Sequence, residues 1–181
     1  MAPTVDAARL VFLDESGVTT DLLRRYGRCA RGQRLIDHAP FGHWQTHTIL
    51  AALRREGLTA PAVFDGPIDQ ATFVAYLQQV LAPTLRPGDI VVLDNLSVHK
   101  DPHARAAIEQ TGAAMWFLPP YSPDFNPIEQ VFAKLKAFFR AARPRSFDQV
   151  CALFATALGH FSAAECTNYL RHCGYSADTE Q

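Results

Sequence analysis

Three acidic residues occupy positions from which they could jointly bind divalent metal ions. Asp14 and Asp94 each follow a short apolar run, residues 10–13 and 90–93, of the kind that forms a buried strand. Glu129 lies further along the chain, at the predicted start of a helix. Hard cations such as Mg²⁺ prefer carboxylate oxygens, and a pair of them can promote phosphodiester cleavage. The three acids therefore suggest metal-dependent phosphoryl chemistry, provided that the fold brings them together.

Each of these acids also has an ordinary structural explanation when it is taken alone. Asp14 or Asp94 could terminate its strand or cap the turn that follows. Glu129 could complete a capping box with Asn126 and would suit the positive end of the helix dipole. Composition and periodicity leave both interpretations open, because only the functional one needs all three residues at once.

The composition is that of a globular protein with a substantial core. Of the 181 residues, 48% are hydrophobic and 19% are charged, which favours one domain over residues 1–181. A net charge of −1 argues against nucleic-acid binding by the whole surface but allows a local basic stripe. The four cysteines form no CxxC pair, which favours free thiols. No run approaches the roughly 20 apolar residues that a membrane-spanning helix needs.

The predicted elements begin with strands, continue with alternating helices and strands, and end with helices. The first strand is expected to end in a polar turn over residues 14–17. Further strands or extended pieces are expected near residues 26–30, 33–37, 43–53, 58–65, 89–93 and 113–118. Helices are expected after the N-caps Asp69, Asp101, Asn126, Ser146 and Ser162, with Pro102 and Pro127 as first helical residues. This order predicts an α/β arrangement with a mixed sheet.

Three motifs resemble the DDE endonuclease domain of mariner-like bacterial insertion-sequence transposases. They are LDESG at 13–17, LDNLSVHK at 93–100 and LPPYSPDFNPIEQVFAKLK at 118–136. The PYSPDFNPIE string is the most specific of these, and the interval from Asp94 to Glu129 matches a spacing that the family uses. YGRCARGQR at 26–34 resembles the family's hairpin, although Cys29 stands where an aromatic residue is usual. The resemblance covers about residues 9–143.

The resemblance implies an RNase H-like fold, with a mixed central β-sheet flanked by α-helices and extra C-terminal helices over 144–173. It implies that Asp14, Asp94 and Glu129 form the catalytic, metal-binding triad. Two Mg²⁺ ions are expected at each site, and Mn²⁺ can substitute for them. The implied activity is DNA cleavage at transposon ends followed by strand transfer into target DNA.

The implied partners are double-stranded DNA and further copies of the chain, at least a dimer in the active complex. The implied location is the bacterial cytoplasm, at the nucleoid when DNA is bound. Full-length relatives carry N-terminal helix-turn-helix modules, and the early position of Asp14 predicts that none is present here. The chain is then half of a split transposase with a separately encoded helix-turn-helix half, an excised piece, or a non-catalytic remnant that dimerises with intact transposase and modulates it. A self-sufficient resolvase-like nuclease fits the chemistry but not the proline-rich loop.

Four further residues are expected to lie beside the three acids without binding the metal themselves. Glu15 alternates to the opposite face of its strand from Asp14. Asp124 is expected to hold the proline-rich loop through local hydrogen bonds, and Asn126 to act as a helix cap. His99, together with the adjacent Lys100, could reach a phosphate or could belong to a solvated loop.

Two basic groups are candidate DNA-binding surfaces. Lys136, Arg140 and Arg143 follow Glu129 at intervals close to whole helical turns, which returns them to the same helix face. An ordinary solvated face is the alternative. The second group is either a DNA surface or merely a basic hairpin, and comprises Arg24, Arg25, Arg28, Arg31 and Arg34.

Overall fold

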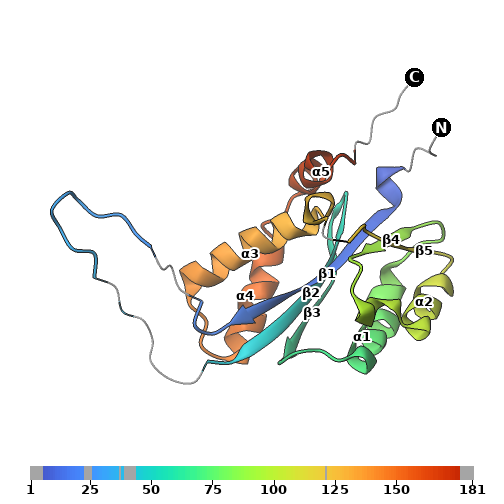
Figure 1. Ribbon diagram of the computed structural model, residues 1–181, viewed down its shortest axis with the longest axis horizontal. Coiled ribbons are helices and arrows are strands. Elements are labelled where there is room, and N and C mark those ends of the chain that lie inside the picture. The colour runs from blue at the N-terminus through green and yellow to red at the C-terminus, as the bar shows by residue number, and fades with distance from the viewer. Residues whose placement is uncertain (1–5, 23–25, 37, 39–43, 121, 176–181) are drawn as a thin grey trace.

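Five strands form one mixed sheet in a computed structural model, which describes residues 6–22, 26–36, 38, 44–120 and 122–175 (Figure 1). The strands are β1 (Leu10–Thr19), β2 (Thr46–Arg54), β3 (Gly57–Asp65), β4 (Ile90–Leu93) and β5 (Ala114–Phe117). Their order across the sheet is β3-β2-β1-β4-β5. The pairs β1–β2 and β2–β3 are antiparallel, whereas β1–β4 and β4–β5 are parallel. The predicted mixed α/β sheet flanked by helices is confirmed.

The interior position of β4 explains its continuous apolar sequence. Val91, Val92 and Leu93 are buried, and the strand lies between β1 and β5. A parallel strand covered on both faces reads as an unbroken apolar run, because neither face meets water. The prediction of a central parallel strand near residues 89–93 is therefore confirmed.

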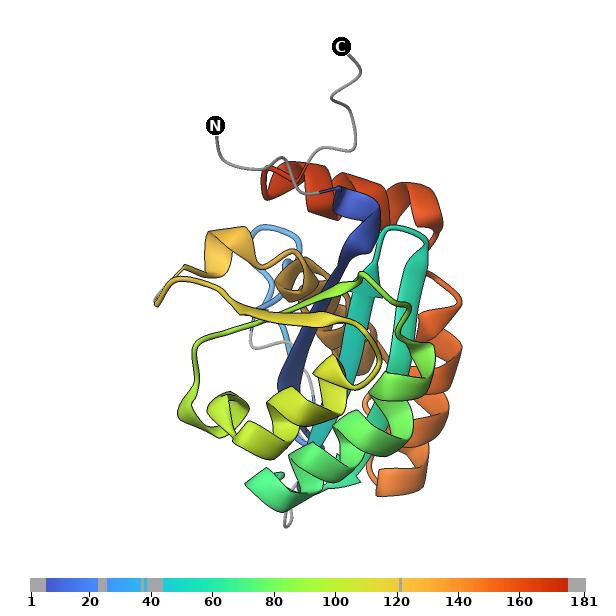
Figure 2. The ribbon, with the colours of Figure 1, turned by 90° about the vertical axis from the view of Figure 1, so that its right-hand side faces the viewer.

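The described residues form five α-helices beside the sheet. Of these, α3 and α4 lie on one side of it and α1 and α2 on the other (Figure 1). They are α1 (Gln70–Tyr76), α2 (Pro102–Glu109), α3 (Ile128–Ala142), α4 (Phe147–Leu158) and α5 (Ala163–His172). The predicted caps Asp69, Asp101, Ser146 and Ser162 each accept a backbone N–H at a helix start. After α1 the chain continues as a π-helical turn, Leu77–Leu81, and a 3₁₀ turn, Ala82–Thr84. Figure 2 shows α5 beside the start of β1.

Alternating side chains of β1 supply two separate cores. Val11 and Leu13 pack in the core on the α1 and α2 side, whereas Leu10 and Phe12 pack in the core that includes α3, α4 and α5. Asp14 continues the series of Leu10 and Phe12, because side chains two residues apart on a strand share a face. The first acid therefore faces α3.

Two predictions about the N-terminal part of the chain are wrong. The strand does not end in a polar turn at Asp14, because β1 continues to Thr19, paired with β2 from Phe12↔Leu53 to Thr19↔Thr46. The predicted hairpin strands are also absent from residues 26–36, which are exposed and contain a turn at 31–32. This stretch offers no buried apolar face that could hold a strand against the sheet. Residue 37, the last of the second predicted strand, lies outside the described residues.

Two compositional predictions concern the cysteines and the helices. All four cysteines are free thiols, as predicted. No single helix within the described ranges has the length and apolar character to cross a membrane. The pair α4 and α5, bent by 90°, passes that test jointly on length and composition alone.

Candidate active site

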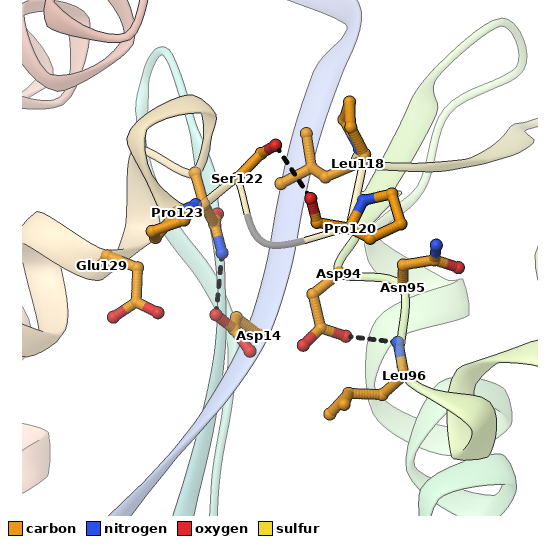
Figure 3. Close-up of a pocket in the computed structure, with 11 residues that line it drawn as sticks. Asp14, Asp94, Asn95, Leu96, Leu118, Pro120, Ser122, Pro123 and Glu129 are labelled. Atoms are coloured by element: carbon orange, nitrogen blue, oxygen red, sulfur yellow. Dashed lines mark hydrogen bonds between the residues drawn. The ribbon is translucent and has the colours of Figure 1, made fainter.

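The three acids line one pocket of about 520 Å³, and their carboxylates point into it from three different elements (Figure 3). Phe12 of β1 pairs with Val92 of β4 in parallel register. Two residues further along, Asp14 and Asp94 therefore lie next to each other on the same face of the sheet. Glu129 comes from the first turn of α3, which packs against β1. The convergence on which the metal hypothesis depends is thus present in the fold.

Asp14 is the most buried of the three acids, with 8% of its surface exposed. Its Oδ1 accepts the backbone N–H of Glu15 at 2.8 Å, and its Oδ2 accepts Nδ2 of Asn126 at 2.8 Å. Burial raises the pKa of Asp14 to about 7, and the carboxylates of Glu129 and Asp94 push it in the same direction. The two hydrogen bonds oppose this rise in pKa without cancelling it.

Asp94 is held by its neighbour His99. Its Oδ1 accepts Nδ1 of His99 at 2.7 Å and the backbone N–H of Leu96 at 3.2 Å. Partial burial acts to raise the pKa of Asp94, but the hydrogen bond and charge of His99 lower it overall. Burial acts in the opposite sense on His99, yet Asp94 and Glu15 raise the histidine's pKa to about 9. His99 is therefore a cation at neutral pH that locks one oxygen of Asp94.

His99 is 1% exposed, and its ring packs on Phe73 with the centroids 4.7 Å apart. The interpretation of this residue as part of a solvated loop is therefore wrong, whereas the phosphate contact stays a prediction. Its Nε2 lies 3.9 Å from Oε2 of Glu15, which is too long for a hydrogen bond, and that buried oxygen has no hydrogen-bond partner. Glu15 thus acts on Asp94 through the charge of His99, from the opposite face of β1 to Asp14. Lys100 is exposed directly beside this pair.

Asn126 does not cap α3 as predicted. The helix begins at Ile128, Pro127 occupies the cap position without a side-chain hydrogen bond, and the Asn126 amide instead reaches Asp14, 112 residues away. The capping-box explanation of Glu129 fails with it, because no side chain caps this helix. Asp124 is exposed, and its carboxylate makes no hydrogen bond to any described residue, so its predicted role in holding the loop is wrong. Backbone hydrogen bonds from Phe125 and Asn126 hold that turn.

The α3 helix carries two of the predicted DNA-binding residues along the face of Glu129. Its opposite stripe is buried in the core, which fixes the rotation of the helix. Lys136 and Arg140 are half-buried on the remaining face, and neither forms an ion pair or a hydrogen bond with another described residue. Arg143 ends the helix with φ 53° and is exposed.

The second basic group is exposed but lies apart from regular structure. Arg28, Arg31 and Arg34 belong to the excursion of residues 26–36 between β1 and β2, which projects away from the sheet in Figure 1. Arg24 and Arg25 lie outside the described residues.

The three carboxylates are suitable ligands for a divalent cation, although they do not lie close enough together to coordinate one in this conformation. Asp14, Asp94 and Glu129 supply hard oxygen ligands, and the only cationic side chain bonded to any of them within the described chain is His99. Their mutual repulsion is one cause of the raised pKa of Asp14, and a cation would relieve it. No three acidic, histidine or cysteine side chains of the described residues already stand close enough to hold a metal ion.

The pocket also contains residues that the sequence did not single out. Asn95, Leu96, Leu118, Pro119 and Pro120 line it together with the acids. Only their position in the sequence could have identified them as pocket residues, because two of them directly follow Asp94 and the other three open the proline-rich motif. Apolar residues at such positions are indistinguishable from core residues until the register of β4 and β5 is known.

Comparison with known proteins gives a consistent result. A family profile described as DDE superfamily endonuclease matches residues 9–151. The fold is similar to that of Mos1 transposase in its paired-end complex with the left transposon end, at a TM-score of 0.72 and 18% identity, over 94% of this chain and 53% of that one.

Two further Mos1 structures show the same fold. The Mos1 strand transfer complex gives a TM-score of 0.71 at 19% identity over 92% of this chain and 51% of that one, and the Mos1 mariner transposase catalytic domain gives 0.64 at 15% over 92% and 76%. The chain spans about half the length of the transposase in the two complexes. No curated protein sequence matches the chain.

Proposed function

Because the chain belongs to the DDE superfamily endonuclease family, we propose that it is the catalytic domain of a transposase. On this proposal it cleaves DNA strands at transposon ends and transfers them into target DNA. The observation that carries the proposal is the meeting of Asp14, Asp94 and Glu129 in one pocket. Mos1 structures determined with transposon ends support the choice of substrate.

We assign metal binding to the same three carboxylates, with Mg²⁺ as the resident ion, Mn²⁺ as a substitute and two ions per site. Solved structures of Mos1 with Mg and with Mn support this assignment. When bound, such ions activate an attacking oxygen and stabilise the leaving oxygen of a phosphodiester. The remaining catalytic contribution is positioning, which the chain itself supplies.

Hydrogen bonds from neighbouring residues orient two of the three ligands. Asn126 and the backbone N–H of Glu15 each hold one oxygen of Asp14. His99 holds Oδ1 of Asp94, which leaves Oδ2 of that residue facing the pocket. Such outer partners typically set the orientation and basicity of a metal ligand.

DNA contact is assigned to exposed and half-buried cations around the pocket. On this proposal Lys100 contacts a phosphate near the acids, Lys136, Arg140 and Arg143 contact phosphates along the helix that leads away from them, and Arg28 and Arg31 contact another part of the duplex. Contacts of this kind give affinity that falls steeply with salt and carry no sequence preference.

The whole assembly is proposed to contain at least two copies of the chain and double-stranded DNA, in the bacterial cytoplasm at the nucleoid. Paired-end and strand transfer complexes of Mos1 support an assembly that brings DNA ends together. On this proposal, a helix-turn-helix module recognises the end sequence.

The test is Mn²⁺ titration and plasmid nicking by the wild type, Asp94→Asn and the control Asp148→Asn. Asp148 is an exposed acid on α4 that does not line the pocket. We expect Mn²⁺ binding and metal-dependent nicking in the wild type and the control, and loss of both in Asp94→Asn. Nicking that survives in Asp94→Asn contradicts the triad. A wild type that neither binds Mn²⁺ with DNA present nor nicks DNA favours the non-catalytic remnant.

A further inference from the structure

The sheet face that carries the acids continues as an apolar strip across β4 and β5. Phe12 of β1 pairs with Val92 of β4, and Val92 pairs with Trp116 of β5. Phe12 and Val92 belong to the core on the α3 side of the sheet. Residues paired in register share a face, so the Trp116 side chain also lies on the α3 side.

The next row on the same face contains the catalytic acids. Two residues beyond Phe12, Val92 and Trp116 along their strands come Asp14, Asp94 and Leu118 respectively. The backbone N–H of Leu118 donates to the carbonyl of Leu93, which keeps this row in register beyond the end of β5. Two residues along a strand span about 7 Å, so Trp116 is separated by about that distance along its strand from the row that contains Asp14, Asp94 and Leu118.

Exposure increases along the apolar row toward the edge of the sheet. Phe12 is fully buried, with its ring 4.8 Å from that of Tyr175, and Val92 is 6% exposed. Trp116 is 46% exposed at the edge strand, while α2 packs on the other face of β5. A large aromatic side chain is therefore nearly half exposed, two residues along the chain from Leu118, which lines the pocket.

The pocket itself has one acidic wall and one apolar wall. Asp14, Asp94 and Glu129 form the first, and Leu118 and Pro120 lie across from them in Figure 3. Leu118 belongs both to the pocket and to the strip that leads to Trp116, so the apolar wall is continuous with the exposed ring. Acids that hold a cation suit a phosphate, and an adjacent apolar wall suits the base of the same strand.

We propose that Trp116, with Leu118, forms a stacking seat for an unpaired base of the DNA strand whose phosphate lies at the three carboxylates. This inference rests on the proposed function and adds to it the form of the substrate, a strand locally unstacked beside the scissile phosphate. A protein partner fits the strip less well. A specific protein interface buries at least about 1,000 Å², whereas this strip is a short edge strand with one exposed aromatic ring.

Intrinsic fluorescence tests the proposal directly, because the chain has two tryptophans. The other one, Trp44, is 62% exposed next to the start of β2, and Trp44→Phe leaves Trp116 as the sole indole. The Trp44→Phe protein is titrated with a short single-stranded oligonucleotide and with a blunt duplex of equal length. Mn²⁺ is present, and gel electrophoresis checks that the strands stay intact.

We expect the single strand to quench Trp116 and the blunt duplex to quench it much less. Trp116→Ala in the otherwise native chain should weaken single-strand binding by about ten-fold or more, as removal of a stacking ring does. Trp116→Phe should recover most of that affinity, and Trp44→Ala should leave it unchanged. Because stacking involves no counterion, Trp116→Ala should lower affinity without changing the slope of log K against log salt.

The outcomes separate failure of this inference from failure of the proposed function. DNA binding with an unquenched Trp116 and an unaffected Trp116→Ala overturns the stacking seat and leaves the nuclease proposal standing. Absence of binding to both DNA forms overturns the two together. Trp116 emission that changes with protein concentration alone, with a matching rise in mass by ultracentrifugation, identifies the strip as an interface between copies and also overturns the inference.

Discussion

Replacing Asp14 by asparagine should stabilise the metal-free protein at high pH, although it removes one of the three proposed metal ligands. The folded protein raises the pKa of this carboxyl from 3.8 to about 7, mainly through burial. Below pH 3.8 both folded and unfolded chains keep the proton, so the group costs the fold nothing. Between pH 3.8 and about 7 the unfolded chain releases this proton more readily than the folded chain does. The free energy of unfolding therefore falls as the pH rises through this range.

The size of this loss follows from the two pKa values. A change from 3.8 to about 7 corresponds to an upper bound of about 4 kcal/mol, at about 1.4 kcal/mol for each pKa unit. Water entry and relaxation reduce it, and we expect about 1–4 kcal/mol. The substituted amide fits the site, because its oxygen can accept the N–H of Glu15 while the Asn126 amide turns to accept from its nitrogen.

The assay is thermal unfolding in a chelator at about pH 4 and about pH 9, with Asp148→Asn as the exposed-acid control. We expect Asp14→Asn to exceed the wild type in Tm by about 2–10 °C at the higher pH and by little at the lower pH. Added Mn²⁺ should raise the Tm of the wild type at the higher pH and raise that of Asp14→Asn far less. A Tm difference that does not depend on pH would refute the burial argument.

Three further predictions concern residues around the acids. His99→Ala should weaken Mn²⁺ affinity or nicking by about 10–100-fold, and His99→Gln, which keeps a donor, should recover part of the loss, as titration and plasmid assays will show. Asn126→Ala should lower Mn²⁺ affinity more at neutral pH than at high pH, because loss of the amide donor raises the pKa of Asp14 further. An affinity that falls equally at all pH values contradicts this role of Asn126. Lys136→Ala should reduce the slope of log K against log salt for duplex binding by about one, and an unchanged slope removes Lys136 from the DNA surface.

Local sequence patterns predicted most helices and strands correctly. The predictions failed where a residue's structure depends on a partner that is distant in the sequence. Caps such as Asp69 and Ser162 were identifiable because the residues that they bond lie three positions away. The extent of β1 was not identifiable, because residues 14–17 look like a polar turn until β2 pairs with them. Asn126 was misassigned for the same reason, since its partner Asp14 is 112 residues away and only the fold selects it over the helix end.

The three proposed ligands also differ in how firmly the fold holds them. Asp14 is fixed by two hydrogen bonds and Asp94 by its bonds to His99 and Leu96, on neighbouring strands of one sheet. Glu129 is exposed, and its carboxylate has no hydrogen bond to any described residue. Two of the three carboxylates are therefore preorganised, and the third is free to adjust. On the proposed function Asp14 and Asp94 would hold the cation in preorganised positions and Glu129 would add a further oxygen from a mobile side chain, so Glu129→Gln should weaken Mn²⁺ binding less than Asp94→Asn does in parallel titrations.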